Sequence, residues 1–147
     1  MHILVATDAD HVVDDVTAAL GGPDVSFTVC RNGRDVSGVV QQRQPDLVVL
    51  DLQSGSMGAM AVTMSLRLDE SASNAVRSRV LMLLDRQSDV HLARRCDADG
   101  WIIKPLDPMK IKRAVRTILE PPVAIVEDPD LTSAEPELSE EDAAVVG

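Results

Sequence analysis

The chain has 147 residues, 45% of them apolar, and carries a formal net charge of −10 at pH 7. This length predicts one domain with room for a proper core. Trp101 and Phe27 are the only aromatic residues, so that core must be aliphatic. No apolar stretch approaches the roughly 20 residues that span a bilayer. Asp8 and Asp10 interrupt the region where a secretory signal would be apolar, so we expect a cytoplasmic protein.

The charge is unevenly distributed along the chain. All 14 Lys and Arg precede Glu120, whereas nine of the 24 Asp and Glu lie between Glu120 and Gly147. This last segment also contains four prolines and no sustained apolar periodicity, which is typical of disorder. We therefore expect a folded domain over residues 1–119 and an acidic, proline-containing, disordered tail over residues 120–147. The nearly neutral domain is no obvious nucleic-acid binder.

Strand and helix patterns alternate five times along the folded part. The strand patterns are short and rich in Val, Leu and Ile, and they cover Ile3–Thr7, Val25–Cys30, Leu47–Asp51, Val80–Leu84 and Gly100–Ile103. The helix patterns run from Asp10 to Gly21, from Gly33 to Gln44, from Met57 to Asp69, from Asp89 to Cys96 and from Asp107 to Leu119. Asp10 stands where an N-cap is expected, and Asp107 followed by Pro108 opens the last helix.

The third helix pattern has an apolar stripe rich in methionine. Met57, Met60, Met64 and Leu68 recur at helical spacing. Methionine commonly fills irregular gaps between packed elements. We therefore expect this stripe to pack in the core.

Five βα units predict a doubly wound α/β fold of the flavodoxin and CheY type, with a five-stranded parallel sheet and five helices. A common strand order for such a sheet is 2-1-3-4-5, which places the first and third strands side by side. Asp8 and Asp51 then end neighbouring strands. Two carboxylates so close raise each other's pKa unless a cation lies between them. Mg²⁺, which takes one or two carboxylates and keeps several waters, suits that position.

A third charged residue completes this edge of the predicted sheet. The strand pattern Gly100–Ile103 is followed by Lys104 and Pro105. Carboxyl ends of parallel strands meet at one edge, where ligands of such folds bind. Two carboxylates and one lysine would form a pocket for a divalent cation and a phosphoryl group.

At these residues the chain resembles the receiver domain of bacterial response regulators over about residues 1–119. The resemblance implies that Asp51 accepts a phosphoryl group and that Lys104 contacts the phosphoryl oxygens. It implies that Mg²⁺ is bound by Asp8, by Asp51 and by the backbone carbonyl of Gln53. Trp101 matches an aromatic switch residue of the family.

Three residues depart from the family pattern. Thr7 replaces one of two acids, so we expect weak Mg²⁺ binding. Leu84 stands where a Thr or Ser hydroxyl normally reaches the phosphoryl group, and Asp85 stands where a small residue normally allows access. Asp85 either repels an incoming phosphate or supplies the carboxylate that Thr7 no longer provides. The pattern therefore predicts an intact fold with an atypical, degenerate pocket.

The resemblance predicts a stand-alone receiver in two-component signalling rather than an enzyme. Its expected partners are a histidine kinase or phosphotransfer protein, and a downstream protein that contacts the last two helices. A homodimer is possible, and neither nucleic acid nor a membrane is expected as a partner. Eight of the 14 basic residues lie in the region of those two helices: Arg86, Arg94, Arg95, Lys104, Lys110, Lys112, Arg113 and Arg116.

Two alternatives remain at the level of the sequence. The first is a phosphorylation-independent pseudo-receiver that acts only through its surface, which Thr7, Leu84 and Asp85 favour. The second is a phosphatase similar to the haloacid dehalogenases, because Asp8 and Asp10 form an Asp-x-Asp motif after a strand. The pattern that ends at Leu84 lacks the Thr or Ser that such enzymes need.

Overall fold

The structure is a computed structural model that describes residues 1–51, 58–73 and 76–120. Its strands are β1 (His2–Ala6), β2 (Ser26–Cys30), β3 (Leu47–Asp51), β4 (Val80–Leu84) and β5 (Gly100–Ile103). Its α-helices are α1 (Asp10–Leu20), α2 (Val36–Arg43), α3 (Ala59–Ser73), α4 (Val90–Arg95) and α5 (Pro108–Leu119). The strands form one parallel sheet in the order β2-β1-β3-β4-β5, which confirms the predicted fold. No described helix is long and apolar enough to cross a membrane.

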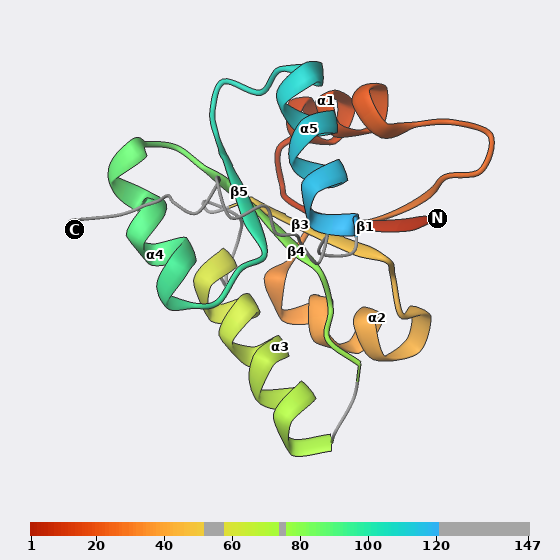
Figure 1. The fold of residues 1–147 in the computed structure, drawn as a ribbon. Helices are drawn as coiled ribbons and strands as arrows, with labels where there is room; N and C mark the ends of the chain where they lie inside the picture. The colour runs from red at the N-terminus through yellow and green to blue at the C-terminus, as the bar shows by residue number, and fades with distance from the viewer. Residues whose placement is uncertain (52–57, 74–75, 121–147) are drawn as a thin grey trace, which may run out of the picture.

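Two helical layers cover the sheet, as Figure 1 shows. Helices α1 and α5 pack together on one face, and α2, α3 and α4 cover the other. Buried strand residues alternate between the layers: Leu4 and Met82 pack on the side of α2, α3 and α4, whereas Ile3 and Leu81 pack on the side of α1 and α5. Because β1, β3 and β4 are covered on both faces, their sequences are continuous apolar runs.

The two predicted helix caps have different outcomes. Asp107 caps α5 as expected, because its Oδ1 accepts the N–H of Met109 at 2.8 Å. The prediction that Asp10 caps α1 is wrong. The N-cap is Ala9, and Asp10 is the first helical residue, without a side-chain cap bond. Asp10 instead pairs with Arg31 at 2.7 Å on the surface.

Helix α3 packs through a different face from the predicted one. Val62 and Leu66 are buried, whereas Met64 is 53% exposed and Leu68 is 66% exposed. Met57 lies outside the described residues. The prediction of a core stripe is therefore wrong at Met64 and Leu68, whereas Met60 packs against the core. Two apolar stripes share this helix, and periodicity alone does not say which one meets the sheet.

Both cysteines, Cys30 and Cys96, are buried, free thiols. Cys30 and Cys96 pack in the layer formed with α2, α3 and α4. Burial raises the pKa of each thiol above its usual value. Both side chains therefore act as small apolar residues near neutral pH.

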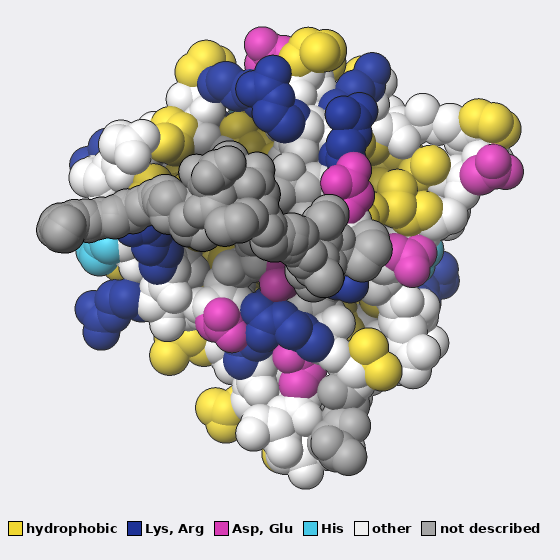
Figure 2. All heavy atoms as spheres, in the orientation of Figure 1, with side chains coloured by type: hydrophobic (Ala, Val, Ile, Leu, Met, Phe, Trp, Pro, Cys, Tyr) yellow, Lys and Arg dark blue, Asp and Glu magenta, His cyan; other side chains and the backbone are white. Residues whose placement is uncertain are grey.

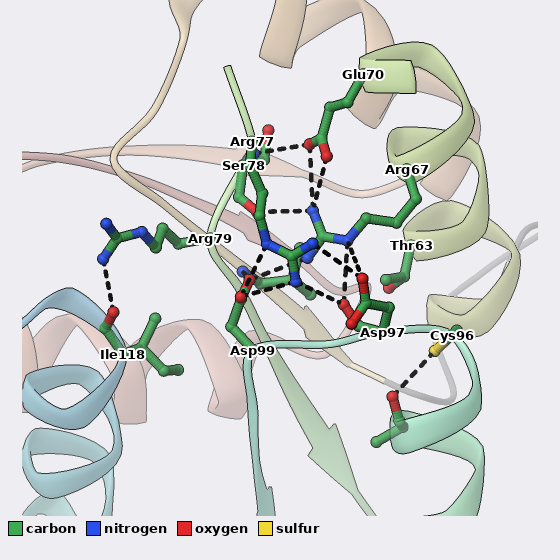
Figure 3. Close-up of polar contacts among 12 residues, drawn as sticks. Thr63, Arg67, Glu70, Arg77, Ser78, Arg79, Cys96, Asp97, Asp99 and Ile118 are labelled. Carbon is green, nitrogen blue, oxygen red and sulfur yellow. Dashed lines mark hydrogen bonds and ion pairs between the residues drawn. The ribbon is translucent and has the colours of Figure 1, made fainter. Parts of the chain in front are cut away.

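A network of ion pairs lies beside the amino-terminal end of β4, shown in Figure 3. The guanidinium of Arg67, whose side chain is only 13% exposed, pairs with Asp99 at 2.9 Å and with Glu70 at 3.1 Å. Arg77 pairs with both Asp97 and Asp99 at 2.9 Å. The hydrogen bond from Arg77 holds the pKa of Asp97 below its usual value. This network joins α3 to the segments that precede β4 and β5.

We predict that Asp99 is the essential member of this network. Its Oδ2 also accepts the N–H of Val80 at 2.7 Å, and its side chain is 18% exposed. Asp99→Ala would leave this N–H without its acceptor and would remove one of the carboxylates paired with Arg67, which keeps Glu70. The free energy of unfolding should therefore fall by about 1–3 kcal/mol. Urea unfolding followed by Trp101 fluorescence measures the change.

The matched control is Asp97→Ala. The side chain of Asp97 is 67% exposed, so its ion pairs with Arg67 and Arg77 should contribute less than about 1 kcal/mol. Equal losses for the two variants would contradict the central position of Asp99.

Candidate functional site

The carboxyl ends of the parallel strands bring the predicted site residues to one edge of the sheet. Asp51 ends β3, Asp85 directly follows β4, and Lys104 directly follows β5. Asp8 follows β1, the other neighbour of β3. Gln53 lies outside the described residues. The parallel topology therefore gathers residues that lie far apart in the sequence.

Asp51 is a buried carboxylate held at both oxygens. Its side chain is 4% exposed. Oδ1 accepts a hydrogen bond from Lys104 Nζ at 2.9 Å, and Oδ2 accepts one from the hydroxyl of Thr7 at 2.9 Å. The Thr7 oxygen in turn accepts the N–H of Ala9 at 3.1 Å, which orients the hydroxyl. The carboxylate is thus fixed in one orientation by a charge on one side and a neutral donor on the other.

Lys104 lies between two carboxylates. Its Nζ is 2.9 Å from Asp51 Oδ1 and 3.2 Å from Asp85 Oδ1, and its side chain is 24% exposed. Burial alone would lower the pKa of Lys104, but the hydrogen bonds and charges of Asp51 and Asp85 outweigh it and raise that pKa above its usual value. Lys104 is therefore a cation throughout the neutral pH range. The peptide bond to Pro105 is cis.

The described donors fit a magnesium ion with few protein ligands. Asp8 is an exposed carboxylate two residues after β1, the neighbour of the strand that ends at the buried Asp51, and carboxylate oxygens suit Mg²⁺. Within the described ranges, no cluster of three His, Cys, Asp or Glu could hold a metal. Two carboxylates with water in the remaining positions match the way Mg²⁺ is usually bound.

The predicted switch residues Leu84 and Trp101 pack in an apolar layer rather than against the Asp51 carboxylate. Leu84 is fully buried among the apolar residues beneath α3 and α4. Trp101 is half-buried in the same layer, and the guanidinium of Arg94 lies 5.4 Å from its ring centroid. This distance allows a cation–π contact between β5 and α4.

Two contacts of the site were not predicted from the sequence. The first is the hydrogen bond from Thr7 to Asp51, because the sequence indicates only that an acid is missing at Thr7. Strand register could have indicated it, since Ala6 pairs with Leu50 and places Thr7 beside Asp51. The second is the ion pair of Asp85 with Lys104, which depends on side-chain directions after two different strands.

Residues 3–116 match the family model of the response regulator receiver domain. The chain belongs to this family. It is 30% identical over 119 residues to the DNA-binding response regulator MtrA of Mycobacterium tuberculosis, across 80% of this chain and 50% of that protein. It is 23% identical over 117 residues to protein PilH of Pseudomonas aeruginosa, across 80% of this chain and 96% of PilH. This receiver domain thus spans about half the length of the MtrA relatives.

Solved structures share the fold of this receiver domain. The chemotaxis response regulator CheY4 of Vibrio cholerae matches with a TM-score of 0.70 at 18% identity, over 80% of this chain and 98% of that one. The BeF3-activated receiver domain of Klebsiella pneumoniae RstA matches with a TM-score of 0.70 at 24% identity, over 82% and 100%. A receiver domain is a signalling module rather than an enzyme, so family membership decides against the phosphatase alternative.

We predict weak Mg²⁺ binding that depends on Asp8. Thr7 contributes no charge, so the affinity should lie in the millimolar range, and Thr7→Asp should tighten it by about 10- to 100-fold. Asp8→Ala should abolish it. Titration of Mg²⁺ followed by amide NMR shifts measures the affinity.

Asp15→Ala is the matched control, because Asp15 is an exposed acid on α1 outside the pocket. Unchanged affinity in Asp8→Ala would remove Asp8 from the site. An equal loss in both variants would indicate non-specific attraction between Mg²⁺ and the acidic chain.

Proposed function

We propose that this receiver domain accepts a phosphoryl group on Asp51 and signals by protein–protein contact. The observation that carries the proposal is the buried carboxylate of Asp51, held 2.9 Å from the Lys104 ammonium at the carboxyl end of β3. Family membership supplies the setting, because receiver domains act in two-component signalling with a histidine kinase. The match to PilH over nearly its whole length supports action as a single receiver domain.

The proposed reaction is a transfer from a phosphohistidine to Asp51. A carboxylate oxygen of Asp51 attacks the phosphorus of a phosphohistidine, the new O–P bond forms, and the P–N bond breaks to release the imidazole. Lys104 stabilises charge on the phosphoryl oxygens, and Thr7 fixes the carboxylate through Oδ2. Mg²⁺ held by Asp8 and Asp51 would supply positive charge that offsets repulsion between the carboxylate and the phosphoryl group.

We also propose that the pocket is atypical. The structure supports this through three residues: Thr7 is neutral where an acid is expected, Leu84 offers no hydroxyl, and Asp85 brings a carboxylate to Lys104. The same residues favour the second candidate, a pseudo-receiver that acts without phosphorylation. The two candidates differ in whether Asp51 reacts at all.

The proposed partner surface is the side formed by α4, β5 and α5. Figure 2 shows Lys and Arg side chains gathered over α5 at the top of the view and near α4 at the left. A groove of about 570 Å³ runs between β5 and α5, with Trp101, Lys110, Arg113 and Ile118 in its lining. Cationic side chains around an apolar floor favour a protein with an acidic contact face.

The acidic segment 120–147 lies almost wholly outside the described residues. We propose that the receiver domain ends near Leu119 and that this segment is a separate tail. Among the described residues, the apolar layers reach Leu119, the last residue of α5.

We predict that Asp51 is the site of phosphorylation. Incubation with acetyl phosphate and Mg²⁺ should add one phosphoryl group to the protein, measured by intact mass spectrometry. Asp51→Asn should abolish the addition, since an amide oxygen is a poor nucleophile. Asp24→Asn, which changes an exposed acid far from the site, should leave it unchanged. Addition that persists in Asp51→Asn would contradict the assignment, and no addition to the unmodified protein would favour the pseudo-receiver.

A second prediction concerns transmission from the site to α4 and α5. Leu84 has no hydroxyl to draw its loop toward a phosphoryl group, so beryllofluoride, a phosphoryl mimic, should cause only small amide shifts in both helices. Leu84→Thr combined with Asp85→Ala should enlarge those shifts several-fold.

The control for this prediction is Leu84→Val combined with Asp85→Ala. Valine has the shape of threonine without its hydroxyl, so any difference between the two double variants reports the hydroxyl. Large shifts in the unmodified protein, or equal shifts in both double variants, would count against this account.

A further inference from the structure

The ammonium of Lys104 has two carboxylate partners, and the second one is not needed to hold Asp51. Lys104 Nζ contacts Asp51 Oδ1 at 2.9 Å and Asp85 Oδ1 at 3.2 Å. An ammonium has three N–H donors. Among the described residues these two contacts occupy two of them, which leaves one direction for a phosphoryl oxygen. Asp85 therefore occupies a position on Lys104 that an incoming anion could otherwise use.

The charge of Asp85 could either repel an incoming phosphate or supply the carboxylate that Thr7 lacks. The position of Asp85 distinguishes these two roles. Thr7 bonds Oδ2 of Asp51, whereas Lys104 and Asp85 lie on the side of Oδ1. Asp85 thus does not replace an acid at the position of Thr7. Its carboxylate acts on the lysine that meets the phosphoryl group.

Asp85 can release Lys104 at little structural cost. Its side chain is 31% exposed, and it follows β4 rather than lying within the strand. By contrast, the side chain of Asp51 is 4% exposed. The charged neighbour, Arg86, directs its guanidinium toward Asp89 at 3.6 Å. Lys104 is therefore the cation that the structure places against Asp85.

We infer that Asp85 is a charge gate that competes with the phosphoryl donor for Lys104 and selects against donors with two negative charges. This inference rests on the proposed phosphorylation of Asp51, because it identifies Asp85 as the residue that regulates that reaction. A phosphoryl oxygen bound to the same ammonium would lie within about 6 Å of the Asp85 carboxylate, where unit charges near a protein surface interact strongly. At this range, salt screens the repulsion only partly. The repulsion doubles for a dianion relative to a monoanion.

The test compares two small donors of different charge at pH 7. Acetyl phosphate is a dianion: attack by Asp51 forms the O–P bond, breaks the P–O bond and releases acetate. Phosphoramidate carries about one net negative charge: the same attack breaks its P–N bond and releases ammonia. Initial rates with Mg²⁺ are measured by intact mass spectrometry on the full chain.

Asp85→Asn keeps the shape of the side chain and removes its charge. It should raise the rate with acetyl phosphate by about tenfold and the rate with phosphoramidate by only about threefold, in proportion to donor charge. Asp85→Glu keeps the charge and should stay within about twofold of the unmodified protein for both donors. Equal acceleration with both donors would indicate a steric effect and overturn the gate. Slower or unchanged reaction in Asp85→Asn would show that Asp85 does not oppose the donor.

Orthophosphate binding tests the charge gate independently of whether Asp51 is phosphorylated. If no donor phosphorylates any variant, the proposed function fails, and binding of orthophosphate then decides the gate. Titration followed through the Lys104 amide shift should give about tenfold tighter binding in Asp85→Asn than in Asp85→Glu. Equal binding, or no binding by either variant, would overturn the charge gate.

Discussion

The ion pair between Asp51 and Lys104 is the interaction on which the candidate site depends. It joins the ends of β3 and β5, two strands that are separated in the sheet by β4. Burial of a carboxylate is unfavourable unless its oxygens receive charged or polar donors, and here Lys104 and Thr7 supply them. The apolar strands fix the positions of both ends of the pair.

The same pair shows why the neighbouring substitutions matter. Among the described residues, Lys104 is the cation paired with Asp51, and Asp85 shares its ammonium. Thr7 fixes the geometry of Asp51 but adds no ligand charge for a metal. In the part of the chain that the structure describes, Asp51 and Asp85 therefore share the positive charge of Lys104, and Thr7 adds none.

The two edges of the sheet use charge for different purposes. At the amino-terminal edge, Arg67 and Arg77 are matched by three carboxylates and tie α3 to the starts of β4 and β5 (Figure 3). At the carboxyl edge, Asp51 and Asp85 share the single ammonium of Lys104. The first arrangement links helix to strand and stabilises the fold. The second lies at the edge where the ligands of such sheets bind.

The sequence by itself determined the fold and the positions of Asp51 and Lys104, because strands buried on both faces must be continuous apolar runs and parallel strands place their carboxyl ends together. It could not determine which stripe of α3 meets the sheet, since Met64 and Val62 both belong to helical repeats. Only the tertiary structure decided that Thr7 bonds Asp51 and that Asp85 bonds Lys104. Those contacts join residues from different strand ends, and their side-chain directions follow from packing in three dimensions rather than from spacing along the chain.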